Sequence, residues 1–339
     1  MDTSYQCLAC SGEDSRSILT KGELVLVRCR DCGFVQIDPL PPVSEYEASY
    51  EEAEDYGEAL LRDEELFVQR DRAVLEELAN LGGQGPLLDL GAGAGIILAA
   101  AKDRGWSSTG LELCRPNAEK IRQRLGVAVH EQSIERAPLD DESFSVVTMS
   151  HSLEHVHNPL HTLEAAHRVL KADGLLHIAV PNWRAVKRFV LGRHIPWIFP
   201  GHISYFTRGT LEQLLRRTGF EVVRAQTLPF TCTLDHRFAI SVVRRLRLEP
   251  PIQRFLKIGQ RPLETLLGDH VQLDCPPWRF RMVDRLCRVL LRLWPDRASC
   301  WFGMGEELRV TARKVRPIPT MRQPLPEHRA QPQKVRQSS

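Results

Sequence analysis

The sequence lacks any run of about 18 apolar residues, so no transmembrane helix is expected. Its first residues contain no apolar segment followed by a cleavage-type pattern, so a secretory signal peptide is not predicted either. The cysteines number nine, an odd count in a chain without such a signal. We therefore expect reduced thiols and a cytoplasmic protein rather than a disulfide framework.

The chain also lacks a marked excess of either charge, with 45 Lys and Arg residues against 43 Asp and Glu residues. A protein built chiefly to bind nucleic acid would be more basic. Within residues 1–40 the basic side chains are offset by acidic ones, which disfavours RNA docking there. An RNA-directed enzyme stays open as an alternative, and a salt-dependent binding assay would test it.

Four of the cysteines form two pairs, Cys7-x2-Cys10 and Cys29-x2-Cys32, separated by 18 residues. This spacing is typical of two knuckles that place four thiolates around one Zn²⁺. Because all four ligand positions are cysteine, the site is closed and structural. Residues 1–40 are too few for an adequate core, so the predicted zinc ribbon would depend on its metal for folding.

Short apolar strands alternate with helices from residue 60 onward, which predicts an α/β fold with a doubly wound, mostly parallel seven-stranded sheet. The helix after the fourth strand is expected over residues 160–174. The alternating segment EELRVTARKV is expected to form the last strand, antiparallel at the edge of the sheet. The predicted divisions are a ribbon at 1–40, a linker at 41–59, a catalytic domain at 60–314 with a basic helical insertion at 229–303, and a disordered tail at 315–339.

A glycine-rich turn lies between the first strand of this domain and its first following helix. It reads Asp89-Leu-Gly-Ala-Gly-Ala-Gly95, and Glu112 ends the next strand, where a carboxylate can accept both hydroxyls of a ribose. The dinucleotide fingerprint is absent, because its third glycine position falls on Ile96 or Leu98. A nicotinamide-type dinucleotide is therefore disfavoured as the ligand.

The run LLDLGAGAG, then LEL, IERAPLDDESFSVVTMSHSLEHVHNP and AHRVLKADGLLHIAVPN, resembles the class I S-adenosylmethionine-dependent methyltransferases. The resemblance implies a Rossmann-like methyltransferase fold and S-adenosylmethionine as cofactor. It implies that the glycines pass the methionine part, that Asp89 lies near its amino group, and that Ser133 and Ile134 contact adenine. The cofactor-binding residues expected are Asp89, Gly91, Ala92, Gly93, Gly95, Glu112, Leu113, Ser133, Ile134 and Ser150. The family often has Asp where Ser133 and Ser145 stand.

The string Ser150-His151-Ser152-Leu153-Glu154-His155 follows the fourth strand, where the carboxyl ends of strands form a ligand crevice. It resembles a segment of ubiquinone-type O-methyltransferases that can hold a divalent cation through two carboxylates and a His. His151 stands at the first carboxylate position, which disfavours Mg²⁺. The string also spells the inverted zinc-protease motif, but it interrupts a parallel sheet instead of lying on a helix. His155 is expected in the pocket, as a catalytic group or as a loop anchor.

A second candidate segment, Gly201-His202-Ile-Ser-Tyr205-Phe-Thr, follows the fifth strand. It is similar to a segment of zinc-ribbon methyltransferases that methylate carbon atoms of nucleotide-linked deoxysugars, although that family tends to have Glu where Gly201 stands. The resemblance implies His202 as general base, a task for which an ordinary near-neutral pKa is suited. A structural role for His202 and Tyr205 is the alternative.

The function expected is methyl transfer to a small-molecule acceptor, with a nucleotide-linked or lipid-linked sugar as first choice by resemblance. A non-catalytic, cofactor-binding scaffold is the other alternative. The basic helical segment PPWRFRMVDRLCRVLLRLWPD is interpreted as a lid, with peripheral contact to a membrane as the other interpretation. Tyr46, Tyr50 and Tyr56 are expected either to close over the cofactor or to belong to a solvated linker.

Overall fold

The computed structural model describes residues 5–43, 64–195, 197–228 and 303–315, together with Tyr46 and Cys300. Most of the predicted linker, the helical insertion and the C-terminal tail lie outside these residues, as do Tyr50 and Tyr56. Within the described part of the chain, no helix combines the length and the apolar character needed to cross a bilayer.

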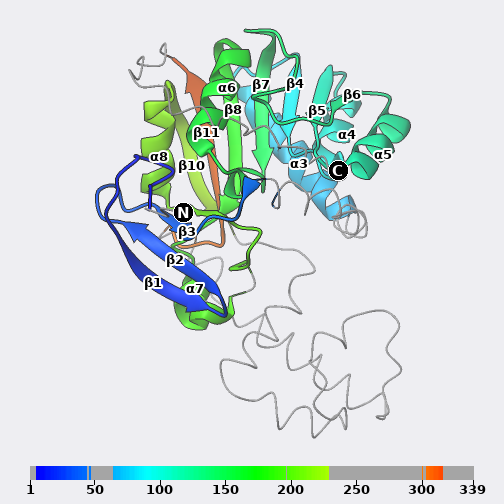
Figure 1. Cartoon of the computed structure of the whole chain (residues 1–339). Coiled ribbons are helices and arrows are strands. Elements are labelled where there is room, and N and C mark those ends of the chain that lie inside the picture. Colours follow the sequence, from blue (N-terminus) through cyan, green and yellow to red (C-terminus); the bar gives the residue numbers. More distant parts are fainter. Residues whose placement is uncertain are drawn as a thin grey trace, which may run out of the picture.

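A seven-stranded sheet forms the centre of the molecule, in the order β10-β11-β8-β7-β4-β5-β6 (Figure 1). Five of its strands are mutually parallel neighbours: β4 (Leu87–Leu90), β5 (Ser108–Leu111), β6 (Ala128–His130), β7 (Phe144–Ser150) and β8 (Leu170–Pro181). The other two are β10 (Phe220–Leu228) and β11 (Glu307–Lys314). The predicted mostly parallel, seven-stranded sheet is confirmed.

Helices cover both faces of this sheet. One face packs on the apolar sides of α3 (Glu64–Asn80), α4 (Ile96–Asp103) and α5 (Arg115–Leu125). The other face packs on α6 (Pro159–Val169) and α8 (Arg208–Arg217). Each helix buries its apolar stripe against the sheet, because neither a helix nor the sheet could bury its apolar side chains alone. This mutual burial is the physical basis of a doubly wound domain.

Two details of the prediction are wrong. The segment EELRVTARKV forms β11, which is antiparallel as expected but lies between β8 and β10 and not at the edge. Its side chains are mostly buried because it is paired on both sides, whereas β10 at the edge keeps many exposed ones. The helix α6 ends at Val169, because residues 170–174 already belong to β8.

A second, four-stranded sheet contains the N-terminal segment, with the order β1-β2-β3-β9. Its strands β1 (Ser15–Lys21), β2 (Leu24–Cys29) and β3 (Val35–Ile37) are antiparallel. The fourth strand, β9 (Ser204–Tyr205), comes from the loop after β8. The N-terminal sheet is therefore completed by the same loop that carries His202, which the sequence did not predict.

Candidate active site

The glycine-rich turn lies at the carboxyl end of β4, next to the carboxyl end of β5. Gly91, Gly93 and Gly95 have φ values of 76°, 56° and 72°, in the left-handed region that favours glycine. A Cβ on Gly91 would also lie 2.8 Å from the Cβ of Ser152. The amides of Gly91 and Ala92 both donate to the carbonyl of Leu111 at 2.9 Å, so the turn is held against β5.

Glu112 bridges the glycine turn and the end of β5. Its carboxylate accepts hydrogen bonds from the amide of Gly93 at 2.6 Å and from the amide of Cys114 at 2.9 Å. Burial raises the pKa of this carboxyl, and the two amides oppose that shift. A carboxylate has about four lone-pair positions, so acceptor capacity is left for the hydroxyl groups of a ligand.

Asp89 lies inside the sheet, where the hydroxyl of Thr148 on β7 donates to it at 2.7 Å. Burial raises the pKa of Asp89 to about 8, and the hydrogen bond from Thr148 opposes this shift. The carboxyl is thus mostly protonated at neutral pH. A cationic group placed beside it would favour the ionised form.

The remaining cofactor residues that the sequence singled out lie around the same strand ends. Leu113 is 37% exposed, an unusual state for an apolar residue at the end of a buried strand. Ser133 lies in the turn after β6, where its carbonyl accepts from the amides of Arg136 and Ala137, and Ile134 is buried. Ser150 ends β7. The exposed Leu113 thus offers an apolar surface beside these strand ends.

Arg70 of α3 is a further candidate site residue that sequence reasoning missed. Its guanidinium donates to the carboxylate of Asp71 at 2.8 Å and to the hydroxyl of Ser150 at 3.4 Å. A small cavity lies beside it, lined in part by Ser150, His177 and Arg309. Because Arg70 is separated from the glycine turn by about 20 residues of helix and loop, only its position in the fold reveals the connection.

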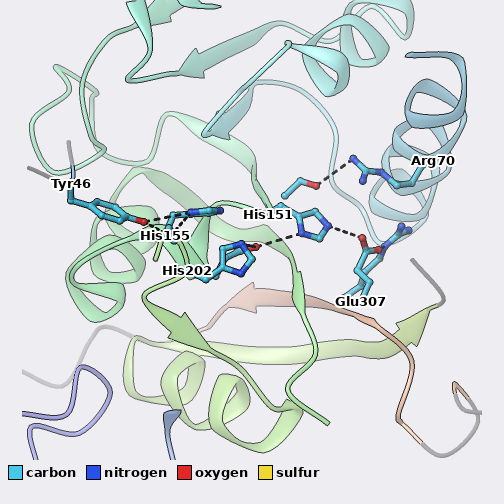
Figure 2. Close-up of polar contacts among 10 residues, drawn as sticks. Tyr46, Arg70, His151, His155, His202 and Glu307 are labelled. Carbon is cyan, nitrogen blue, oxygen red and sulfur yellow. Dashed lines mark hydrogen bonds and ion pairs between the residues drawn. The ribbon is translucent and has the colours of Figure 1, made fainter. Parts of the chain in front are cut away.

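His151 is directed away from the other histidines of the site and towards β11 (Figure 2). Its backbone has a φ of 54°, uncommon for a residue other than glycine. Its Nε2 lies 2.8 Å from a carboxylate oxygen of Glu307, and its Nδ1 lies 3.5 Å from one of Glu154. Burial alone would lower the pKa of His151, but these carboxylates outweigh it and raise the pKa to about 9.

Glu154, His155 and His202 converge where the short helix η1 (Leu153–His155) meets the loop before β9 (Figure 2). Their potential ligand atoms all lie within 4.8 Å of one another. The rings of His155 and His202 meet edge to face at 4.6 Å. Neither oxygen of the buried Glu154 makes a hydrogen bond with the described residues, and its nearest contacts are ion-pair distances to His151 and, at 3.9 Å, to Nε2 of His202.

The hydrogen bonds of His155 indicate its tautomer. Its Nδ1 lies 2.7 Å from the carbonyl of Gly201, so this nitrogen carries the proton and Nε2 has the lone pair. Tyr46 also donates to the carbonyl of Gly201. His155 is half-buried, whereas His202 is only 7% exposed. The more accessible proton acceptor of the pair is therefore His155.

His202 does not keep the near-neutral pKa that the sequence analysis assumed. Burial, with a smaller effect of the neighbouring His155, lowers its pKa to about 3, and Glu154 acts in the opposite sense. His202 is neutral at physiological pH in this environment. Tyr205, the third residue singled out as catalytic, lies farther along β9, with its ring 6.4 Å from that of His202 and packed against Trp183.

Several of these residues together could bind a cation. An oxygen and two imidazole nitrogens are a donor set that suits Zn²⁺ or another transition ion better than Mg²⁺. The set is Glu154, His155 and His202. The sequence left open whether a metal binds at His151, Glu154 and His155. His151 instead pairs with Glu307, a residue far away in the sequence.

The four predicted zinc ligands come together in the N-terminal segment. The sulfurs of Cys7 and Cys32 are 3.5 Å apart, as are those of Cys10 and Cys29, and all four lie within 4.8 Å of one another. Four sulfurs at about 2.3 Å from a tetrahedral Zn²⁺ would be about 3.8 Å apart. The described geometry thus fits the donor set of a closed zinc site.

Residues 62–225 match a family model described as a methyltransferase domain. This span contains the glycine turn, Glu112 and the histidines. A methyltransferase domain therefore occupies residues 62–225.

Ubiquinone biosynthesis O-methyltransferases are among the relatives found. The one from Pseudomonas aeruginosa LESB58 is 35% identical over 114 residues, which cover 32% of this chain and 49% of that protein. The one from Haemophilus ducreyi is 30% identical over 115 residues, which cover 31% of this chain and 48% of that protein.

The chain spans about half the length of the curated relatives that it matches. Among solved structures, a 1,6-didemethyltoxoflavin-N1-methyltransferase from Burkholderia thailandensis has a TM-score of 0.49 at 18% identity and covers 89% of this chain and all of that one. For a methyltransferase from Archaeoglobus fulgidus the TM-score is 0.46 at 18% identity, and the match covers 74% of this chain and 94% of that one.

The ion pair of His151 with Glu307 joins β7 and its following loop to β11. We expect its contribution to the free energy of unfolding to depend on pH. The pKa of His151 is raised from its ordinary 6.5 to about 9 in the fold. Its contribution is therefore fully present below pH 6.5 and is lost as the pH rises through 9. Replacing His151 by Gln should remove stability on the order of 2 kcal/mol at pH 6 and little at pH 10.

Thermal melting of both proteins between pH 6 and pH 10 measures this difference. The exposed His161 of α6 provides the control, because His161→Gln should melt like the wild type at every pH. Parallel melting curves for wild type and His151→Gln across the range would show that the pair does not stabilise the fold.

Proposed function

We propose that this protein transfers a methyl group from S-adenosylmethionine to a small-molecule acceptor that reaches His155. The observation that carries the proposal is the glycine turn with Glu112 beside it, inside a methyltransferase domain. The turn packs against Ser152, three residues before His155. Bound S-adenosylmethionine supplies a methyl group on a sulfonium, which leaves as a neutral thioether. Positioning and proton removal are then the main tasks of the protein.

The cofactor would lie along the carboxyl ends of β4, β5 and β7. Glu112 would accept the ribose hydroxyls, and the exposed Leu113 would be covered by the adenine, with Ser133 and Ile134 at its other edge. Glycines in the left-handed conformation let the backbone approach the methionine part closely. Arg70, already anchored on Asp71 and Ser150, would pair with the methionine carboxylate, and Asp89 would face the amino group across a short gap.

The acceptor would lie between this pocket and the loop before β9. The lone pair on Nε2 of His155 can take the acceptor's proton, and the carbonyl of Gly201 holds the ring in that orientation. The buried Glu154 beside both rings would stabilise the imidazolium that forms. In this arrangement His202 packs against His155 and positions it, and Tyr205 anchors the loop to the ribbon.

The ribbon would be a structural zinc module that bounds the acceptor side. We propose a nucleotide-linked or lipid-linked sugar as the acceptor, because the four-cysteine ribbon and the His202 segment together resemble the sugar C-methyltransferases. The relatives in ubiquinone biosynthesis make a phenolic acceptor the second candidate, since they match this chain over 114 residues at 35% identity.

Replacing His155 by Ala should lower methyl transfer by about 100-fold or more while leaving cofactor affinity unchanged, because it removes the proton acceptor and not a cofactor contact. The assay would follow label from methyl-labelled S-adenosylmethionine into nucleotide-linked deoxysugars and, separately, into catechols. His202→Ala should reduce transfer less, through loss of positioning.

The exposed His161→Ala variant is the matched control and should retain full activity. Wild-type rates in His155→Ala would exclude this base. Failure of the folded wild type to bind S-adenosylmethionine at all would overturn the proposed function.

A further inference from the structure

Two arginines from different parts of the chain lie on one face of the ribbon sheet without a carboxylate partner. Arg28 belongs to β2, and Arg188 belongs to α7 (Val186–Leu191), the short helix after β8. Figure 1 shows α7 beside β1 and β2, and the apolar residues of both elements share one cluster. Among the described residues, neither guanidinium forms an ion pair with an acidic side chain.

The strand register places Arg28 towards α7. Arg28 is directly opposite Val35 of β3, and Val35 is directly opposite Tyr205 of β9, so all three side chains are on the same face. The ring of Tyr205 packs against Trp183 at 5.2 Å. The guanidinium of Arg188 lies over Trp183 at 4.3 Å, and it therefore belongs to the same face as Arg28.

Arg188 is held in a fixed orientation. Its guanidinium is sandwiched between the rings of Trp183 and Phe189, at 4.3 Å and 4.1 Å, and its Nε donates to the carbonyl of Trp183. Burial lowers the pKa of Arg188, and the nearby charge of Arg28 lowers it further. The two terminal nitrogens of Arg188 make no hydrogen bond with the described residues, so they are available to a ligand.

The donors around these arginines are also without acceptors. In the described part of the chain, the Nε of Arg28, the indole N–H of Trp183 and the hydroxyl of Tyr205 are buried and make no hydrogen bond. Trp183 and Tyr205 are each only 2% exposed. A buried donor without an acceptor costs about 1–3 kcal/mol, and two like charges side by side add to that cost. An acceptor-rich anion between the two guanidinium groups would offset their mutual repulsion.

We propose that Arg28 and Arg188 bind a phosphate or diphosphate group carried by the methyl acceptor. Two guanidinium forks match the oxygens of a phosphate or diphosphate, and charge-assisted hydrogen bonds of this kind are the strong ones. Tyr205 lies between this site and His202, so a phosphate bound here would leave the rest of the acceptor near the histidines. The inference rests on the proposed function, and it makes that acceptor a phosphorylated small molecule.

The first probe is inorganic pyrophosphate, titrated calorimetrically into the full-length protein. Arg28→Gln and Arg188→Gln should each weaken its binding by about tenfold or more. Arg72→Gln removes the same charge from the exposed surface of α3 and should bind like the wild type. Binding of S-adenosylmethionine, measured on the same samples, reports whether each variant is folded and whether the cofactor site is intact.

A second measurement uses the wild type alone, so it does not depend on variants that fold. Pyrophosphate should shield Arg28 and Arg188 from phenylglyoxal, an arginine-specific reagent, while Arg72 is modified as before. Uridine diphosphate and vesicles that contain phosphatidic acid then separate the two sources of the phosphate. Tighter binding of the nucleotide indicates a nucleotide-linked acceptor, and tighter binding of the vesicles indicates a lipid-linked one.

A wild type that binds S-adenosylmethionine but not pyrophosphate would overturn the phosphate site and leave the proposed function standing. Pyrophosphate binding that both Gln variants retain, with no shielding of Arg28 and Arg188, would place the anion elsewhere and also overturn it. Absence of cofactor binding with retained, arginine-dependent pyrophosphate binding would overturn the proposed function instead.

Discussion

Replacing Glu112 by Ala should weaken S-adenosylmethionine binding by at least about 100-fold, the largest single effect on the cofactor site. The variant would lose two charge-assisted hydrogen bonds to the ribose, each worth about 1.5–3 kcal/mol. It would also leave the amides of Gly93 and Cys114 without their present acceptor and loosen the glycine turn. Calorimetric titration of S-adenosylmethionine and of its demethylated product measures the loss.

Two variants separate the ribose contact from the support of the turn. Glu112→Gln keeps one acceptor oxygen but no charge, and an intermediate affinity is expected. Glu119→Ala removes an exposed carboxylate from α5 and should bind like the wild type. Equal cofactor affinity in wild type and Glu112→Ala would show that this carboxylate only braces the turn, and the ribose contact would have to be assigned elsewhere.

Removal of zinc from the four-cysteine site should unfold the ribbon and release the loop that carries His202. Structural zinc contributes apparent free energies of about 10–16 kcal/mol to small zinc domains, far more than three short strands supply. Since β9 pairs only with β3 within the described residues, its amides should lose protection together with those of β2 and β3. Hydrogen exchange before and after chelation measures this, with metal content determined in parallel.

The glycine turn provides an internal comparison, because its amides bond to β5 and not to the ribbon. Its protection and the affinity for S-adenosylmethionine should change much less than the protection of β9. Cys29→Ser should reproduce the effect of chelation, whereas Cys114→Ser, outside the cluster, should retain one zinc per chain. A purified chain without zinc whose β9 amides are fully protected would contradict the ribbon as a metal-dependent element.

The sequence by itself determined the features that depend on neighbouring residues. The spacing within each cysteine pair places two thiolates in one turn, and the geometry of the four sulfurs agrees with it. The run from Asp89 to Gly95 requires left-handed backbone conformations, which all three of its glycines adopt. Alternation of strands and helices determined the doubly wound sheet, because each helix must bury its apolar stripe against the strands beside it.

Only the tertiary structure decided which distant segments meet. Strand β11 lies between β8 and β10, paired antiparallel with both, and its side chains are mostly buried although five of its eight residues are polar. Its insertion brought Glu307 to His151, which also contacts Glu154, and the fold brought His202 to Glu154 and His155. Arg70, Arg28 and Arg188 have ordinary local contexts, and only the fold brings Arg70 to Ser150 and places Arg28 near Arg188. Contacts of this kind follow from strand order and register, which no local spacing encodes.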